Sequence, residues 1–226
     1  LTNYIGNDNF AFNNKGIAFI TDFSTFSSNV RKSIDNFKNH FKNITIYDAG
    51  TVEGLESKVI VDLIQYLNSK GIIPFIIGIE IDIFGNVASL LNKNLYQISN
   101  KITNIANESR FVNNNFIAFQ RHLCELDDLY EIEENYHNAL SLGKMRTYPY
   151  LAEPIIRDCD LLHFNLNAMR SSECRDIDGA LPTGLNAEEI CQLLKYAGTA
   201  NNLKAIIVKS YNTGTSSDAA KLIAEA

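Results

Sequence analysis

The segment "IIPFIIGIEID", from Ile72 to Asp82, carries the strongest indication of the fold. Its first residues are almost all apolar, which is typical of a parallel strand that helices cover on both faces. A glycine then interrupts the run, and two acids, Glu80 and Asp82, follow it. Alternate side chains of an extended backbone point to the same side, so these carboxylates are expected to face together. The segment therefore predicts a buried strand that ends in a polar turn.

Six further apolar runs have the composition of strands, at residues 16–20, 43–47, 94–98, 115–119, 160–166 and 204–210. Between several of these runs lie segments whose apolar residues have the spacing of a helix, most clearly from Val59 to Leu67. Residues 125–142, 186–196 and 217–226 are also predicted helices. Asn186 and Glu189 fit a capping box. Because parallel neighbours need crossover connections, this order predicts a three-layer α/β/α architecture with a mostly parallel central sheet. We expect a single domain over residues 1–226.

Charge and composition exclude several classes of partner. The 226-residue chain has a formal net charge of -6 and no run of lysines or arginines, which argues against a nucleic-acid-binding surface. No apolar run approaches the roughly 20 residues of a transmembrane helix, so no membrane span is expected. The four cysteines form no CxxC pair, which is typical of reduced thiols. These features predict a cytoplasmic protein.

Ligands of open parallel sheets bind beyond the carboxyl ends of the strands, so the residues that follow each strand are the candidate site. Asn165 and Asn167 come at the end of one predicted strand, and Ser210 ends the last one. Amides and hydroxyls carry no charge, whereas manganese and magnesium sites normally use carboxylates or imidazoles. Glu80 and Asp82 have no histidine near them and more often cap a helix or meet solvent. Arg170 could bind an anion here or form a surface ion pair.

Several segments resemble one enzyme family. "EPIIRDCDLLHFNLNAMRSSEC" (Glu153 to Cys174), "GLNAEEICQLLKYAG" (Gly184 to Gly198) and the opening segment are similar to the ureohydrolases, the superfamily of arginase, agmatinase and formimidoylglutamase. The resemblance is strongest to the formimidoylglutamase-like branch, which residues 125–146 and 44–50 also resemble. It covers most of the chain with the matches in order. It implies an α/β/α fold, and in active members two manganese ions whose shared hydroxide attacks a guanidinium or formimino carbon.

The positions that hold the metals in active members have different residues in this chain. Ile81 stands where the resemblance places a histidine, and "SNKIT" (residues 99–103) offers no ligand at the second motif. Asn165 and Asn167 stand where two aspartates belong, and Ser210 replaces a glutamate. The resemblance therefore implies a protein that has lost its binuclear manganese site. We expect no cofactor and no catalytic residue.

Two classes of function follow from these expectations. The first is a catalytically inactive ureohydrolase-like protein that serves as a binding, scaffolding or regulatory component, with an unidentified protein partner, a second copy of itself or a small-molecule ligand. Its ligand cleft would be lined by Glu80, Asn165, Asn167, Arg170 and Ser210. The alternative is a metal-dependent hydrolase of linear amidines in which Glu80, Asp82 and other acids form a substitute site. A nucleophile pair of His122 and Cys124 has no third group to orient it.

Overall fold

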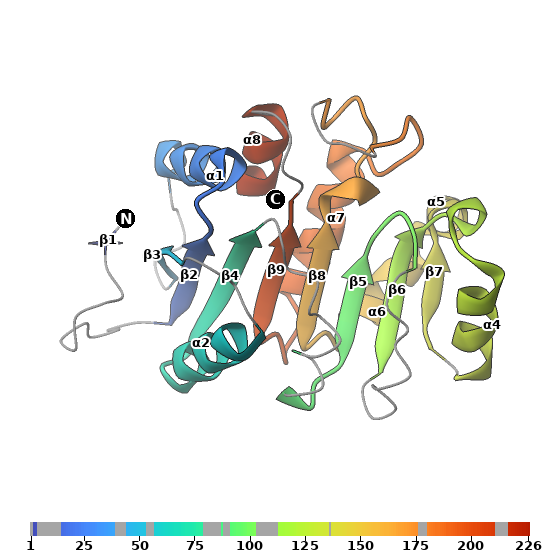
Figure 1. The fold of residues 1–226 in the computed structure, drawn as a ribbon, viewed down its shortest axis with the longest axis horizontal. Coiled ribbons are helices and arrows are strands. Elements are labelled where there is room, and N and C mark those ends of the chain that lie inside the picture. The colour runs from blue at the N-terminus through green and yellow to red at the C-terminus, as the bar shows by residue number, and fades with distance from the viewer. Residues whose placement is uncertain are drawn as a thin grey trace.

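A computed structural model of the chain describes residues 2–3, 15–38, 44–52, 57–78, 87, 91–102, 113–135, 137–175, 180–210 and 217–226. Nine strands form one sheet in the order β1-β3-β2-β4-β9-β8-β5-β6-β7, and every described pair is parallel (Figure 1). The strands are β1 Thr2–Asn3, β2 Gly16–Thr21, β3 Thr45–Thr51, β4 Ile72–Gly78, β5 Leu95–Ile98, β6 Asn114–Phe119, β7 Ala139–Ser141, β8 Leu161–Asn165 and β9 Ala205–Lys209.

Helices connect most of these strands. They are α1 Thr25–Asn36, α2 Ser57–Ser69, α4 Leu126–Glu134, α5 Leu142–Thr147, α6 Ala152–Ile156, α7 Ala187–Gly198 and α8 Ser217–Glu225. The described residues also contain three short 3-10 helices, η1 Arg121–Leu123, η2 Pro149–Leu151 and η3 Leu166–Ala168. Among the described residues, no helix is both long enough and apolar enough to cross a bilayer.

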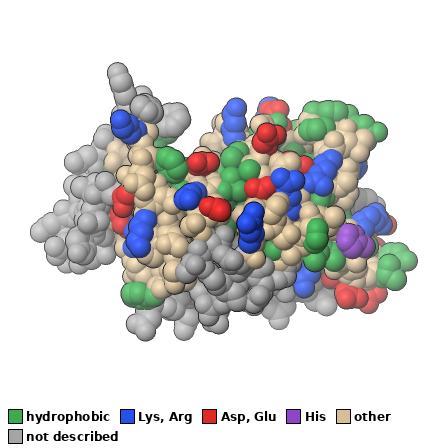
Figure 2. Space-filling model, turned by 90° about the horizontal axis from the view of Figure 1, so that it is seen from above, with side chains coloured by type: hydrophobic (Ala, Val, Ile, Leu, Met, Phe, Trp, Pro, Cys, Tyr) green, Lys and Arg blue, Asp and Glu red, His purple; other side chains and the backbone are tan. Residues whose placement is uncertain are grey.

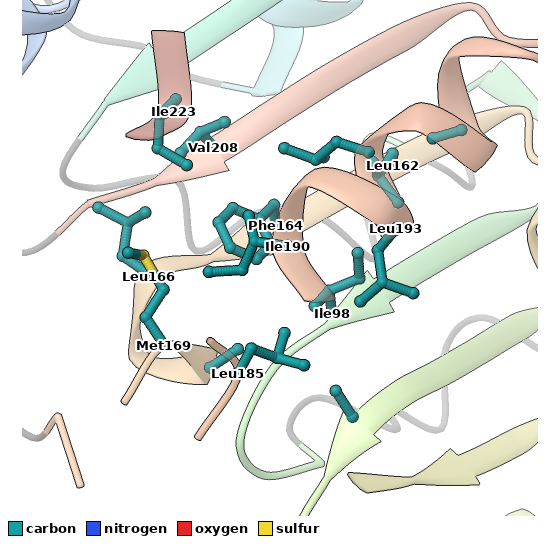
Figure 3. Close-up of a cluster of buried hydrophobic side chains, with 14 of the residues drawn as sticks. Ile98, Leu162, Phe164, Leu166, Met169, Leu185, Ile190, Leu193, Val208 and Ile223 are labelled. Carbon is teal, nitrogen blue, oxygen red and sulfur yellow. The ribbon is translucent and has the colours of Figure 1, made fainter. Parts of the chain in front are cut away.

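The alternation of side chains along each strand divides the core into two layers. Phe164 of β8 and Val208 of β9 face α7 and α8, whose Ile190 and Ile223 pack against them (Figure 3). The neighbouring residues on the same strands point to the other face, where α2 supplies the packing partners. Both faces of the central strands are therefore buried, as their continuous apolar sequences predict. The predicted three-layer α/β/α architecture with a parallel sheet is confirmed.

One predicted helix is wrong over half its length. The sequence predicts a helix over residues 125–142, but α4 ends at Glu134 and the chain then forms the edge strand β7. β7 pairs with β6 through Phe116↔Ala139 and Ile117↔Leu140. A pairing with a strand some twenty residues earlier in the chain is a tertiary effect, and it overrides the helical preference of the local sequence. The seven predicted strands and the helices that begin near residues 57, 187 and 217 are confirmed.

Candidate functional site

The carboxyl ends of the central strands β9, β8 and β5 lie next to one another, because these strands are neighbours in the sheet. This places Ser210, Asn165 and Ser99, each at or just after the end of its strand, on one edge. Viewed toward that edge, lysines and arginines are interspersed with acidic side chains over the described part of the surface (Figure 2). The charge on this face is mixed, without a broad patch of one sign.

Asn165 and Asn167 hold the turn at the end of β8. The Asn165 side-chain oxygen accepts a hydrogen bond of 3.1 Å from the backbone N–H of Asn167, which caps η3. The side-chain oxygen of Asn167 accepts longer hydrogen bonds from the Ser99 hydroxyl, at 3.3 Å, and from the Asn100 N–H, at 3.4 Å. All four residues are buried. The two amides therefore fasten the end of β8 to the end of β5.

Two buried polar atoms beside this turn have no hydrogen-bond partner within the described part of the chain. They are the hydroxyl oxygen of Ser210 and the side-chain oxygen of Asn100. The backbone of Ser210 is well anchored, since its N–H donates to the carbonyl of Gly78 at 2.9 Å. An unpaired buried polar group costs roughly 1 to 3 kcal/mol. These atoms are the ones at this edge that a small hydrogen-bonding ligand would satisfy.

Of the other predicted site residues, Arg170 forms an ion pair, and three lie outside the described residues. The Arg170 guanidinium pairs with the carboxylate of Glu173 at 2.6 Å and its side chain is about 42% exposed. This is the surface ion pair that the sequence left as an alternative to anion binding. Glu80, Ile81 and Asp82 lie outside the described residues.

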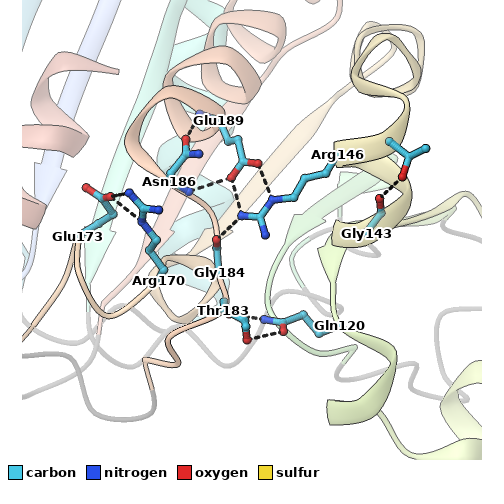
Figure 4. A network of polar contacts seen from close by, with 10 residues as sticks. Gln120, Gly143, Arg146, Arg170, Glu173, Thr183, Gly184, Asn186 and Glu189 are labelled. Carbon is cyan, nitrogen blue, oxygen red and sulfur yellow. Dashed lines mark hydrogen bonds and ion pairs between the residues drawn. The ribbon is translucent and has the colours of Figure 1, made fainter.

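A polar connection that the sequence analysis missed ties the loop before α7 to the ends of β6 and α5 (Figure 4). The Gln120 side chain donates to the Thr183 carbonyl at 2.6 Å and accepts from the Thr183 hydroxyl at 2.9 Å. Gln120 directly follows β6, so the strand-end rule applied to the other strands would have found it. Thr183 has no such signal, because it is 63 residues away in sequence.

Arg146 extends this network to the start of α7. It donates to the Gly184 carbonyl at 2.6 Å and forms two hydrogen bonds with Glu189, at 2.7 and 3.0 Å. Glu189 also accepts from the N–H of Asn186, whose side chain accepts from the N–H of Glu189. The predicted capping box is confirmed. Arg146 adds an ion pair to it.

The Glu189 ion pair predicts a pH dependence of stability. Burial alone raises the pKa of Glu189, but hydrogen bonds from Arg146 and Asn186 outweigh burial and hold the pKa below its ordinary value. A lowered folded-state pKa means that this stabilisation is complete above the unfolded value of 4.5 and is lost as the pH falls through the folded value. We expect Glu189→Gln to cost about 1 kcal/mol at pH 7. The difference from wild type in urea unfolding should shrink toward pH 3, and a constant difference would contradict this assignment.

The described residues support neither a metal-binding cluster nor a nucleophilic thiol elsewhere in the fold. Within them, no group of three or more histidine, cysteine or acidic side chains could hold a metal ion. Burial raises the pKa of the thiols of Cys124, Cys159, Cys174 and Cys191, which opposes formation of a nucleophilic thiolate. His122 lies in η1 and Cys124 directly follows it, so the two residues do not share the extended strand that would point both side chains to one side.

The described residues do not fit a binuclear manganese centre at the end of β8. A neutral amide offers an oxygen without charge, and here both side-chain oxygens already accept hydrogen bonds. Divalent cations of this kind require anionic or imidazole ligands to offset the loss of their hydration. We therefore derive no metal-dependent step from this turn.

Solved structures with a similar fold include formimidoylglutamases, an agmatine ureohydrolase and an arginase. The chain superposes on formiminoglutamase from Trypanosoma cruzi with a TM-score of 0.78 and 12% identity, over 96% of this chain and 92% of that one. It superposes on formimidoylglutamase from Bacillus subtilis with a TM-score of 0.74 and 12% identity, over 96% and 86%. For arginase from Bacillus cereus the TM-score is 0.71, again at 12% identity, over 93% and 96%. No family model and no curated protein matches the sequence.

The sheet order, the helical layers and the polar strand ends define an α/β/α protein of the parallel, open-sheet class. Within that class, the chain has the ureohydrolase fold, shared with formimidoylglutamase, agmatinase and arginase. The resemblance seen in the sequence is confirmed at the level of the fold.

Proposed function

We propose that this protein is a catalytically inactive member of the ureohydrolase fold that acts in the cytoplasm as a binding or regulatory component. The observation that carries the proposal is the bonding of Asn165 and Asn167. Their side-chain oxygens, at positions where the family resemblance places metal-binding aspartates, instead hold the turn together. The strand ends would then serve as a recognition surface and not as a reaction centre.

The physical reason concerns the nucleophile. A metal ion activates bound water by lowering its pKa from the much higher value of bulk water to about 7. Two neutral amides in place of two carboxylates remove two negative charges from such a site, and electrostatics alone then disfavours a pair of divalent ions. Water at such a turn would remain a poor nucleophile near pH 7.

Manganese content and amidine hydrolysis, measured together, test the inactivity. The protein is purified in excess manganese, desalted, and analysed for bound metal, then assayed with formimidoylglutamate, arginine and agmatine. We expect well under one manganese per chain and no release of formamide, urea or ammonia above the blank. The double substitution Asn165→Asp with Asn167→Asp is the matched control, and we expect it to raise manganese affinity. Stoichiometric metal with turnover in the wild type would instead support the alternative, a hydrolase that uses Glu80 and Asp82.

A small-molecule sensor is the second candidate. The oxygens of Ser210 and Asn100, which have no hydrogen-bond partner among the described residues, favour it. The site would present hydroxyl and amide groups, with Asn165 and Asn167 beside them, and would suit a small ligand with several hydrogen-bonding groups. A ligand at one hundred times its dissociation constant stabilises the folded state by about 2.7 kcal/mol. Screening the three amidines and their products by thermal shift tests this. Stabilisation that Ser210→Ala removes would support the sensor, and no stabilisation by any of them would count against it.

A further inference from the structure

A groove lies at the edge of the sheet, between α4 and the last two strands, β6 and β7. Its cavity volume is about 460 Å³, which is within the range of small-molecule sites. β7 ends the order of strands in the described sheet, and α4 lies beside it at the side of the molecule (Figure 1). This edge groove is separated from the Asn165 turn, because β5 lies between β8 and β6.

The floor of the edge groove is apolar. Phe119 of β6 and Ile132 of α4 are buried in a small hydrophobic cluster, and Leu129 and Ala139 pack against that cluster. All four line the groove. An aliphatic chain in the groove would therefore bury apolar surface against a preformed wall, which is worth about 25 cal/mol for each square ångström removed from water.

The rim of the edge groove carries an excess of positive charge. Arg121 follows the end of β6 and Lys144 lies in α5, just after the end of β7, so both line the groove toward the carboxyl ends of the strands. Among the described residues, neither cation has an ion-pair partner. The acid lining the groove is Glu133, in the last turn of α4. Burial lowers the pKa of His137, so its imidazole adds no charge near pH 7.

We propose that the edge groove binds a small amphipathic carboxylate, with its apolar chain on Phe119, Leu129, Ile132 and Ala139 and its carboxylate at Arg121 and Lys144. Two cations that have no ion-pair partner in the described part of the chain, beside an apolar floor, favour an anion over a neutral molecule or an amine. The cavity is too small for a folded partner. This inference goes beyond the proposed function, because the residues lie on other strands and do not depend on the metal-site positions.

Three ligands with the same eight-carbon chain test the charge preference: octanoate, octanol and octylamine. Binding to the wild-type protein is measured by isothermal titration calorimetry. We expect octanoate to bind about fivefold more tightly than octanol, the effect of roughly 1 kcal/mol from a partly exposed ion pair, and octylamine to bind most weakly. Raising the salt concentration should weaken only octanoate. Equal affinity for all three, or no binding of octanoate at millimolar concentration, would overturn the proposal.

Four variants locate the site. Arg121→Gln and Lys144→Gln should each weaken octanoate about twofold, since the two cations share the gain, and leave octanol unchanged. Glu133→Gln is the matched control, since it removes the opposite charge from the same rim, and should leave octanoate binding as tight or tighter. Ala139→Leu narrows the groove and should weaken both octanoate and octanol. Thermal unfolding of each variant verifies that it folds, and octanoate binding that is unaffected by Arg121→Gln, Lys144→Gln and Ala139→Leu would also overturn the proposal.

Discussion

Gly184→Ala is expected to destabilise the protein by about 3 kcal/mol, the upper range for an added methyl group in a closely packed position. A β-carbon at residue 184 would lie 2.5 Å from the Arg170 nitrogen and 2.6 Å from the Met169 carbonyl carbon, both of them backbone atoms. They cannot move aside easily, because Leu185 donates to the Ala168 carbonyl at 2.7 Å and accepts from the Arg170 N–H at 3.0 Å. Urea unfolding followed by circular dichroism measures the loss.

Gly198→Ala is the matched control for this prediction. Gly198 is the last residue of α7, and a β-carbon there would meet no atom within 4 Å. Alanine is the better helix former by up to about 1 kcal/mol, so this variant should be as stable as wild type or slightly more stable. If both substitutions had the same effect, the close contact between the loop and the turn after β8 would not be the reason for the cost of Gly184→Ala.

Asn167→Ala should cost about 2 to 3 kcal/mol, which is the second largest effect we predict. The substitution removes the acceptor of the Ser99 hydroxyl and of the Asn100 N–H, and it leaves both donors in a buried position. Asn167→Asp keeps an oxygen at the same place and should lose less stability than Asn167→Ala. Unfolding free energies of both variants at pH 7 test the ordering.

A double-mutant cycle with Ser99→Ala separates the hydrogen bond from the packing of the Asn167 side chain. If Asn167 accepts from Ser99, the cost of Asn167→Ala should fall when Ser99 is already alanine, because one of the two stranded donors is then absent. Strict additivity of the two substitutions would contradict a direct link between β5 and β8 at this point.

Most strands of the central sheet could be predicted from the sequence because each is a short, continuous apolar run. β4, β8 and β9 are buried on both faces, so their residues are apolar almost without interruption. The start of α7 could also be predicted, since a capping box depends on two residues only three positions apart. Each of these signals is local, so it can be recognised without knowing how distant parts of the chain pack.

The edge of the sheet was harder to predict. The acidic helix α4 is followed after only a few residues by β7, which pairs with β6. A strand of three residues is too short to show the alternation that would distinguish it from a continued helix. The Gln120 and Thr183 contact joins distant parts of the chain, and only the packing of the loop against β6 brings them together. The edge groove depends on the same arrangement, because its lining comes from five different elements.

By itself, the sequence determined that a parallel sheet would end in amides and a hydroxyl at Asn165, Asn167 and Ser210, because strand periodicity and residue type are properties of the chain alone. The tertiary structure decided what those groups do. It turned the Asn165 oxygen toward the Asn167 N–H and the Asn167 oxygen toward donors just after β5. It left the Ser210 hydroxyl without a partner among the described residues, and it paired Arg170 with Glu173. Hydrogen bonds and ion pairs depend on distances of about 3 Å between residues far apart in sequence, and only the folded chain sets those distances.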